Sequence, residues 1–225
     1  MQVNSTGTYA GLMPESTSPF DQHRYQVRLD WGTEGLARLA PADVVVVVDV
    51  LRFSSTVTDA AARGESVALD ERAHSVSLNG AAVAQAAEAS GAIVMLGCLR
   101  NASATAAAIL AEQQRRGTRT SVSILAAGER AGADGPGRFA VEDHLGAGAI
   151  VDALGTLGVD HTSPDAAAAA EAFRGLSGAV RHLLTASGSG QELIDRGLRE
   201  EVLSAAAVDA ASVVPVLRNG VFSAI

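Results

Sequence analysis

Acidic, amide and basic side chains recur at four points where an apolar run of the sequence gives way to a polar segment. Carboxylates hold Mg²⁺ or orient a water molecule, while arginine, amide groups and the free N–H groups at a helix start bind phosphate or sulfonate. Together such groups suit a small anionic substrate with Mg²⁺ between carboxylate and phosphate oxygens. The four groups are Asp49 and Arg52 with Ser54, Ser55 and Thr56; Asn79-Gly80; Arg100-Asn101; and Glu142-Asp143.

Each group also has a purely structural interpretation. Asp49 and Arg52 can pair at the end of a strand, and Asn79 and Asn101 can act as helix N-caps. Glu142 and Asp143 can complement the dipole of the helix that they begin. The case for a site therefore rests on whether the four groups converge.

Residues 44–48 are five consecutive valines, and they predict the element around which the groups are organised. Such a run cannot alternate between a buried and an exposed face, so it indicates a central parallel strand buried on both faces. The strand ends at Asp49, and a helix over 55–63 follows, with Ser54 or Ser55 as its N-cap. Open α/β sheets bind ligands at this carboxyl end of their strands.

The remaining pattern alternates strands and helices, which predicts a three-layer α/β/α fold with a largely parallel central sheet. Residues 1–22 lack periodicity and are expected to form a flexible tail before a single domain, 23–225. Residues 128–137 form a glycine-rich loop. Further strands are expected within 23–31, 66–69, 76–78, 93–96, 121–127, 213–217 and 221–222, and helices over 34–39, 81–89, 102–116, 164–173, 177–186, 191–196 and 198–207, with one more after Glu142-Asp143.

Composition excludes several classes of function. The net charge of −8 and the absence of a basic run argue against nucleic acid as a partner. The chain has no lysine, which excludes a lysine Schiff base and a Walker-type phosphate loop. Cys98 is the only cysteine, so no internal disulfide and no thiolate metal cluster can form. No apolar run is long enough to span a membrane and no secretory signal is visible, so a cytoplasmic protein is expected.

The order of these motifs resembles the 2-phosphosulfolactate phosphatase (ComB) family. Asp49-Val50-Leu51-Arg52, followed by Ser54-Ser55-Thr56, is similar to the family's D-V-L-R-A-T/S-T-T. Ser77-Leu78-Asn79-Gly80 resembles its T-T-N-G, and residues 97–102 resemble its G-x-x-x-N-A. Val141-Glu142-Asp143 with residues 146–151 is similar to its (E/D)-D-x-x-x-(A/C)-G-A-I-V. The likeness covers roughly residues 25–217 and continues in order through Ser187, Gly190, Leu193, Gly197 and Val214-Pro215.

The resemblance implies Mg²⁺-dependent hydrolysis of a phosphate ester on a small sulfonated hydroxy acid. In this hypothesis Asp49 and Asp143, with Glu142, hold Mg²⁺ or orient the attacking water, although a carboxylate could attack phosphorus instead. One alternative is a lapsed family member that binds a small anion or serves only as a scaffold. Another is a phosphatase that acts on a different organophosphate in a reshaped pocket. The matching residues are Asp49, Arg52, Asn79, Gly80, Asn101, Glu142 and Asp143, of which all but Gly80 are the expected catalytic residues. Substrate binding is assigned to Arg52, Ser54, Ser55, Thr56, Asn79 and Gly80.

One segment of the family pattern is missing. Only residues 70–76 separate the expected strand at 66–69 from the Asn-Gly motif, so the family's G-E and N-S-P motifs are absent. Val67, Leu69, Val76 and Leu78 flank this shortened interval. Because monomers rarely leave a large apolar patch open, these residues predict a homo-oligomer with residues 66–89 at or near the contact. A closed-up sheet would instead bury them within one chain.

Overall fold

The computed structural model describes residues 18–71, 73, 77, 79–130, 135 and 137–225. Its central sheet has seven strands in the order β1-β5-β2-β4-β8-β9-β3, of which β1, β5, β2 and β4 are parallel and the others join as antiparallel strands. A separate hairpin pairs β6 with β7. The strands are β1 (Val27–Trp31), β2 (Val44–Val48), β3 (Val67–Ala68), β4 (Ile93–Gly97), β5 (Val122–Ala126), β6 (Glu129–Arg130), β7 (Gly137–Arg138), β8 (Pro215–Arg218) and β9 (Val221–Ala224).

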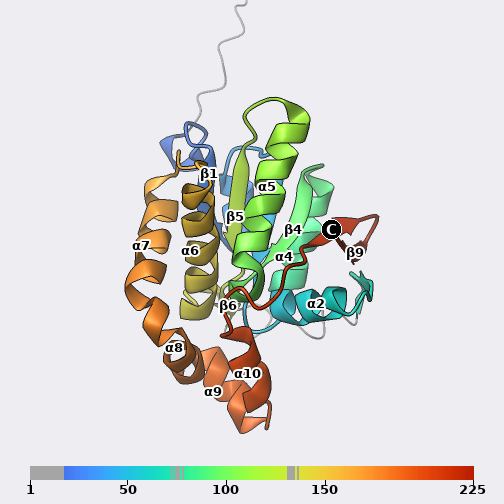
Figure 1. Ribbon diagram of the computed structural model, residues 1–225, viewed down its shortest axis with the longest axis vertical. Coiled ribbons are helices and arrows are strands. Elements are labelled where there is room, and N and C mark those ends of the chain that lie inside the picture. Colours follow the sequence, from blue (N-terminus) through green and yellow to red (C-terminus); the bar gives the residue numbers. More distant parts are fainter. Residues whose placement is uncertain (1–17, 72, 74–76, 78, 131–134, 136) are drawn as a thin grey trace, which may run out of the picture.

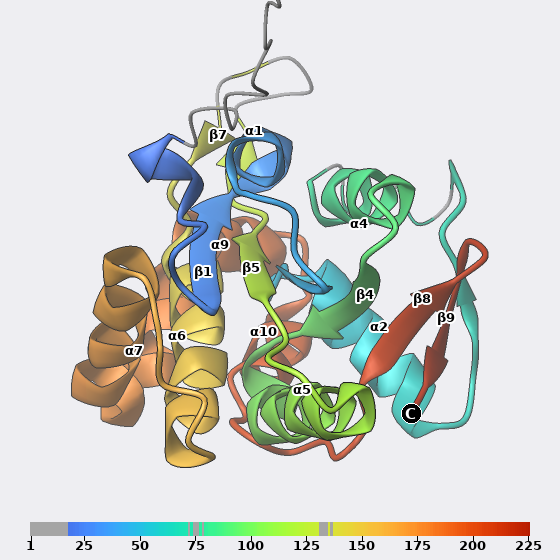
Figure 2. The same cartoon turned by 90° about the horizontal axis from the view of Figure 1, so that it is seen from above.

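Helices cover both faces of the sheet, which confirms the three-layer α/β/α fold. Figure 2 shows α1 (Gly32–Arg38) and α4 (Gly80–Ala89) on one side and α5 (Ala102–Arg116), α6 (Val141–Thr156) and α7 (Pro164–Leu176) on the other. Helix α2 (Phe53–Ala62) packs in the same core cluster as α4. The last helices, α8 (Val180–Ala186), α9 (Gly188–Asp195) and α10 (Arg199–Ala205), lie together below the other layers in Figure 1. Short 3₁₀ turns lie at Pro19–Asp21, Leu99–Asn101 and Ser177–Ala179.

The valine strand β2 is buried on both faces, as predicted. Val44, Val46 and Val48 belong to the core beneath α5, α6 and α7, while Val45 and Val47 belong to the core beneath α2 and α4. Strand β2 lies between β5 and β4, and the last residues of the four parallel strands are in register. This alignment places the residues that follow each strand along one edge of the sheet.

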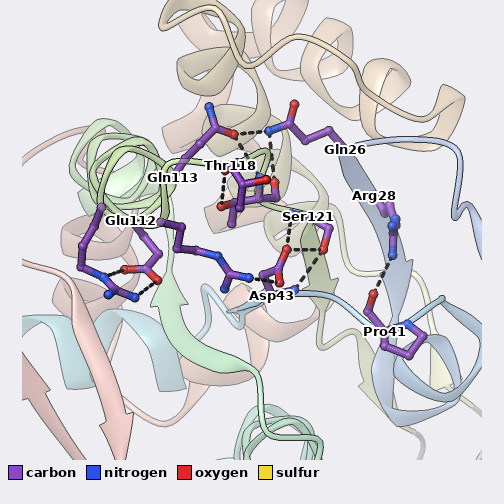
Figure 3. Close-up of polar contacts among 11 residues, drawn as sticks. Gln26, Arg28, Pro41, Asp43, Glu112, Gln113, Thr118 and Ser121 are labelled. Carbon is purple, nitrogen blue, oxygen red and sulfur yellow. Dashed lines mark hydrogen bonds and ion pairs between the residues drawn. The ribbon is translucent and has the colours of Figure 1, made fainter.

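The opposite end of β2 is closed by a structural polar network (Figure 3). Asp43 immediately precedes the strand, and its carboxylate accepts hydrogen bonds from the backbone N–H and the hydroxyl of Ser121 at 2.7 and 2.8 Å. Arg116, at the end of α5, forms an ion pair with the same carboxylate. Gln26 donates to Gln113 in the same region. These polar groups satisfy one another and tie the starts of three strands to α5.

Some helices and strands lie where the sequence predicts them, and others do not. The bounds of α5 match the prediction, and Asn219-Gly220 turns β8 into β9 with both residues at positive φ, as a type I′ turn requires. The predicted break after residue 186 is present, but it is limited to Ser187. The helix predicted over 191–196 begins earlier, at Gly188, because Ser187 caps it and accepts the N–H of Gly190 at 3.0 Å. The predicted tail also extends too far, since Gln22 exchanges two hydrogen bonds with the backbone of Leu29.

Two further expectations concern the shortened segment. The strand expected at 76–78 lies outside the described residues, apart from Ser77, which is not in a strand. Ala81, Val83, Ala84 and Ala87 of α4 are buried within the chain, and Val67 and Leu69 pack against the same core. The described part of this region therefore follows the alternative in which one chain buries its own apolar residues, and homo-oligomer formation stays a prediction. No described helix is long and apolar enough to cross a membrane.

Candidate active site

Three carboxylates are buried at the edge of the sheet where β2 and β5 end. Asp49 follows β2, and Glu142 and Asp143 lie in the first turn of α6, which begins after the β6–β7 hairpin that follows β5. Each is at most 5% exposed. The N–H of Val50 donates to Asp143 Oδ1 at 2.7 Å, so a direct hydrogen bond joins the end of β2 to the start of α6.

Asp49 caps helix α2 with its own carboxylate. Its Oδ1 atom accepts the N–H of Phe53 at 3.2 Å, and its main-chain carbonyl accepts the N–H of Ser54 at 2.8 Å. The expectation that Ser54 or Ser55 caps this helix is wrong, because their hydroxyls donate to the carbonyls of Val47 and Val50. The helix therefore begins at Phe53, and its first N–H groups are already bonded to Asp49.

The second oxygen of Asp49 connects the strand to helix α4. Ser77 donates its hydroxyl hydrogen to Asp49 Oδ2, and the Ser77 oxygen accepts the N–H of Gly80 at 2.9 Å. A Cβ atom at Gly80 would lie only 2.4 Å from Asp49 Oδ2. Glycine at position 80 is thus what lets the start of α4 approach the carboxylate.

Burial and mutual repulsion shape the acid–base properties of the carboxylates. Burial, followed by the negative charges of Asp49 and Glu142, holds the pKa of Asp143 well above its ordinary range. Burial also raises the pKa of Asp49, although hydrogen bonds from Ser77 and from the N–H groups of Phe53 and Gly80 oppose the shift. No ion pair to these three acids is formed within the described part of the chain. A proton or a bound cation would therefore relieve an unfavourable concentration of negative charge.

Gly128 joins Asn79 to the carboxylates. Its N–H donates to Asp143 Oδ2 at 2.9 Å, and its carbonyl accepts from Asn79 Nδ2 at 3.0 Å. The Oδ1 atom of Asn79 is buried and has no partner among the described residues, which leaves one polar atom free for a ligand. Three of the four predicted polar groups, represented by Asp49, Asn79 and Asp143, thus meet at one edge of the sheet.

The remaining predicted group, Arg100-Asn101, lies at the same edge of the sheet, but Asn101 has a structural role there. The side-chain oxygen of Asn101 accepts the N–H of Cys98 at 2.9 Å, and its amide donates to the carbonyls of Leu96 and Val213 at 3.2 and 3.1 Å. These bonds fasten the end of β4 to the segment before β8. Asn101 makes no direct hydrogen bond to Asp49, Glu142 or Asp143 among the described contacts, and its catalytic role stays a prediction.

Arg52, Ser55 and Thr56 line a different cavity, of about 400 Å³, between α2 and α10. The guanidinium of Arg52 forms an ion pair with Glu201 of α10. None of the three buried carboxylates lines this cavity. Arg52 and the residues at the start of α2, which were predicted to bind phosphate, therefore line a different cavity from the one expected beside the carboxylates. Their role in substrate binding stays a prediction.

Ser77, Ser189 and Gly128 also belong to the site, although none of them was predicted from the sequence as a site residue. Ser189, in the first turn of α9, donates its hydroxyl to Glu142 Oε1 across 47 residues of sequence. A signal for two of them was available, since Ser77 lies in the Asn-Gly motif and Ser189 lies between Ser187 and Gly190 of the matching tail. No local signal marks Gly128 apart from its place in a glycine-rich loop.

The carboxylates of the site could supply some, but not all, of the oxygen ligands that Mg²⁺ requires. Mg²⁺ takes oxygen ligands and is commonly bound by one or two carboxylates plus water and substrate phosphate. Asp49 and Asp143 provide two buried carboxylates, and burial together with the charges of Asp49 and Glu142 raises the pKa of Asp143. Each of their oxygens retains a lone pair beyond its hydrogen bond. Among the described residues, no group of three or more acidic, histidine or cysteine side chains is arranged to hold a metal ion. A metal here would thus depend on water and substrate for its remaining ligands.

Comparison with known proteins identifies a family that resembles this chain. The sequence model of the family described as 2-phosphosulpholactate phosphatase matches residues 65–220. The matched region contains Asn79, Asn101, Glu142 and Asp143 but begins after Asp49 and Arg52. No curated protein matches the chain.

Proposed function

The chain belongs to the 2-phosphosulpholactate phosphatase family, and we propose that it is a Mg²⁺-dependent phosphatase that hydrolyses a phosphate ester of a small acidic metabolite. The observation that carries the proposal is the cluster of buried carboxylates at the edge of the sheet, joined through Gly128 to the unpartnered Oδ1 atom of Asn79. In this reaction an oxygen of water bonds to phosphorus, the ester P–O bond breaks, and the alcohol and inorganic phosphate leave.

Asp49 and Asp143 are the proposed ligands of Mg²⁺. The bound ion would supply a positive charge that neutralises the phosphate and stabilises its transition state. Glu142, held by the hydroxyl of Ser189, is placed to orient the attacking water and accept its proton. Asn79 and Gly80 are proposed contacts of the phosphate oxygens only where their present hydrogen bonds open, because Asn79 Nδ2 already donates to Gly128 and the Gly80 N–H to Ser77. The unpartnered Oδ1 atom of Asn79 is an acceptor, so it suits a water molecule or Mg²⁺ instead. Arg52 is the proposed contact of the acidic group of the substrate. It could make this contact only after its ion pair with Glu201 breaks, because that pair occupies the guanidinium.

The separation of Arg52 from the carboxylates favours one alternative. A family member that has lost catalysis would keep the fold and bind a small anion in the cavity of about 400 Å³ beside Arg52. The missing G-E and N-S-P motifs point the same way. This alternative predicts ligand binding without turnover.

A screen of small phosphorylated acids, with Mg²⁺ or with EDTA, tests the proposal. We expect phosphate release that requires Mg²⁺ and that falls at least a hundredfold in Asp49→Asn and Asp143→Asn. Asp152→Asn, which changes a partly exposed acid on the same helix α6, is the matched control and should retain activity. Full Mg²⁺-dependent activity in Asp49→Asn would refute the assignment. Stabilisation by a phosphorylated acid in a thermal shift assay, with no turnover of any ester, would support the lapsed alternative.

A further inference from the structure

A larger cavity adjoins the carboxylate site on the side of Gly128. Its volume is about 510 Å³, within the range of pockets that hold drug-sized ligands and more than a three-carbon acid requires. A second cavity of about 260 Å³ is lined by Asn79 and shares Gly32, Ala127 and Arg130 with the larger one. The two cavities together therefore run from Asn79 into the larger space. They meet the candidate active site at Asn79 and Gly128 and not at its carboxylates, none of which lines either cavity.

Aromatic side chains form one wall of the larger cavity. The rings of Trp31 and Phe139, which both line it, lie 5.2 Å apart, and the ring of His144 stacks against Trp31 at 6.1 Å with an angle of 14° between the planes. Phe139 is nevertheless 60% exposed. An aromatic ring that projects from a packed aromatic cluster into a cavity offers a face for a second ring, since offset or tilted aromatic pairs attract one another.

This wall is in direct contact with the candidate active site. Gly128 has a positive φ of 69°, and a Cβ atom there would lie 3.3 Å from Cε3 of Trp31 and 2.8 Å from the carbonyl oxygen of Arg138. The same glycine donates to Asp143 and accepts from Asn79. Trp31 therefore packs on the residue that holds Asp143 and Asn79 in place, so a substrate whose phosphate lies beside these two residues would have its ester group directed along this wall.

Paired arginines and acids line the rest of the cavity. Three arginines, Arg38, Arg130 and Arg138, line it against two acids, Asp30 and Glu34, in a chain whose net charge is −8. Each of these arginines is paired with an acid: Arg38 with Asp30, Arg130 with Glu34, and Arg138 with Glu129, which does not line the cavity. An acidic group of the substrate would therefore compete with these acids for a guanidinium.

We propose, on the basis of the proposed phosphatase function, that this cavity holds the ester group of the substrate and that this group is aromatic. The preferred substrate is then a small acidic metabolite whose phosphorylated hydroxyl group is on an aromatic ring, with that ring against Trp31 and Phe139, and phenyl phosphate is its simplest analogue. In its hydrolysis the P–O bond to the aryl group breaks, the bonding pair leaves with the aryl oxygen, and that oxygen takes a proton to give a phenol beside inorganic phosphate.

Binding of two phosphonates tests the cavity without turnover, because their P–C bond is not hydrolysed. Trp31 is the only tryptophan of the chain, so its fluorescence reports occupation of the cavity directly. We expect phenylphosphonate to bind at least tenfold more tightly than methylphosphonate. In Phe139→Ala the Kd of phenylphosphonate should rise roughly 3- to 10-fold, because the loss of one aromatic contact weakens binding by about this factor. The Kd of methylphosphonate should stay unchanged. Leu176→Ala, which truncates a 40% exposed side chain on α7, is the matched control and should change neither.

The results separate failure of the cavity from failure of catalysis. Equal binding of the two phosphonates, or an equal effect of Phe139→Ala and Leu176→Ala on phenylphosphonate, overturns the aromatic cavity. Turnover of phosphoglycolate with no effect of Phe139→Ala on kcat/KM for phenyl phosphate overturns it as well, while leaving the phosphatase intact. Selective phenylphosphonate binding that depends on Phe139 supports the cavity even where no ester is hydrolysed, and in that case only the proposed catalysis fails.

Discussion

The buried carboxyl group of Asp143 makes folding stability depend on pH in an unusual direction. Its pKa lies well above the ordinary value of 3.8 because burial and the charges of Asp49 and Glu142 disfavour its ionised form. Between 3.8 and that raised pKa, the folded protein binds a proton that the unfolded chain has released. Stability therefore falls as pH rises through this window and stays reduced above it. An ordinary salt-bridged aspartate has the opposite effect.

The magnitude follows from linkage. Each pH unit by which the folded pKa exceeds the unfolded pKa reduces stability at neutral pH by about 1.4 kcal/mol. Asp143→Asn removes this penalty, because an amide cannot ionise. The variant loses one acceptor, since only one of its two terminal atoms can accept the N–H groups of Val50 and Gly128. That loss costs about 1–3 kcal/mol at every pH. It changes the offset between variant and wild type but not the slope.

Urea unfolding between pH 4 and 8, in EDTA, measures that slope. We expect the free energy of unfolding of Asp143→Asn to rise relative to wild type by up to about 1.4 kcal/mol per pH unit over the lower part of this range. Asp152→Asn, on the same helix, should differ from wild type by less than about 1 kcal/mol throughout, because its ion pair with Arg174 lies near the surface. A difference between Asp143→Asn and wild type that is constant with pH, or that falls as pH rises, would refute the reasoning.

Three further predictions follow from close contacts and from the surface of the molecule. Gly80→Ala places a Cβ atom 2.4 Å from Asp49 Oδ2, and urea unfolding should show a net loss of roughly 1–2 kcal/mol, accompanied by reduced phosphatase activity. In helix α6, Gly148→Ala would place Cβ 2.1 Å from the carbonyl oxygen of Ala169 and should cost about 3 kcal/mol. Gly155→Ala meets no atom within 4 Å and should gain about 0.5–1 kcal/mol, so equal effects at the two positions would contradict the packing of α6 on α7. Light scattering should give the mass of a homo-oligomer, and a monomer at micromolar concentration would end that prediction.

The elements that the sequence predicted well are those whose signals are local. The five valines of β2 can only be buried on both sides, and α5 is an alanine-rich helix that ends at Gly117 in the left-handed conformation. The hairpin between β8 and β9 follows from Asn219-Gly220 for the same reason. In each case the residues that specify the element lie within it or next to it.

The elements that were misplaced depend on contacts between distant residues. Helix α2 begins two residues earlier than predicted because the carboxylate of Asp49, and not a serine of the helix, accepts its first N–H. Arg52 follows Asp49 by only three residues, yet its side chain extends to Glu201, 149 residues away in sequence. Ser189 and Glu142 meet across the first turns of two helices. Spacing along the chain could identify these chemical groups but not the direction in which each side chain points.

The convergence of Asp49, Asn79 and Asp143 also explains why their neighbours are so small. Asp49 approaches the start of α4 only because residue 80 has no side chain, and Trp31 packs against residue 128 for the same reason. Gly128 in turn uses both of its backbone polar groups, one on Asp143 and one on Asn79. A side chain at either glycine would displace an acid or an aromatic ring by about an ångström, a distance that matters for groups that act on one phosphate. The glycines therefore set the geometry of the candidate site as much as the carboxylates set its chemistry.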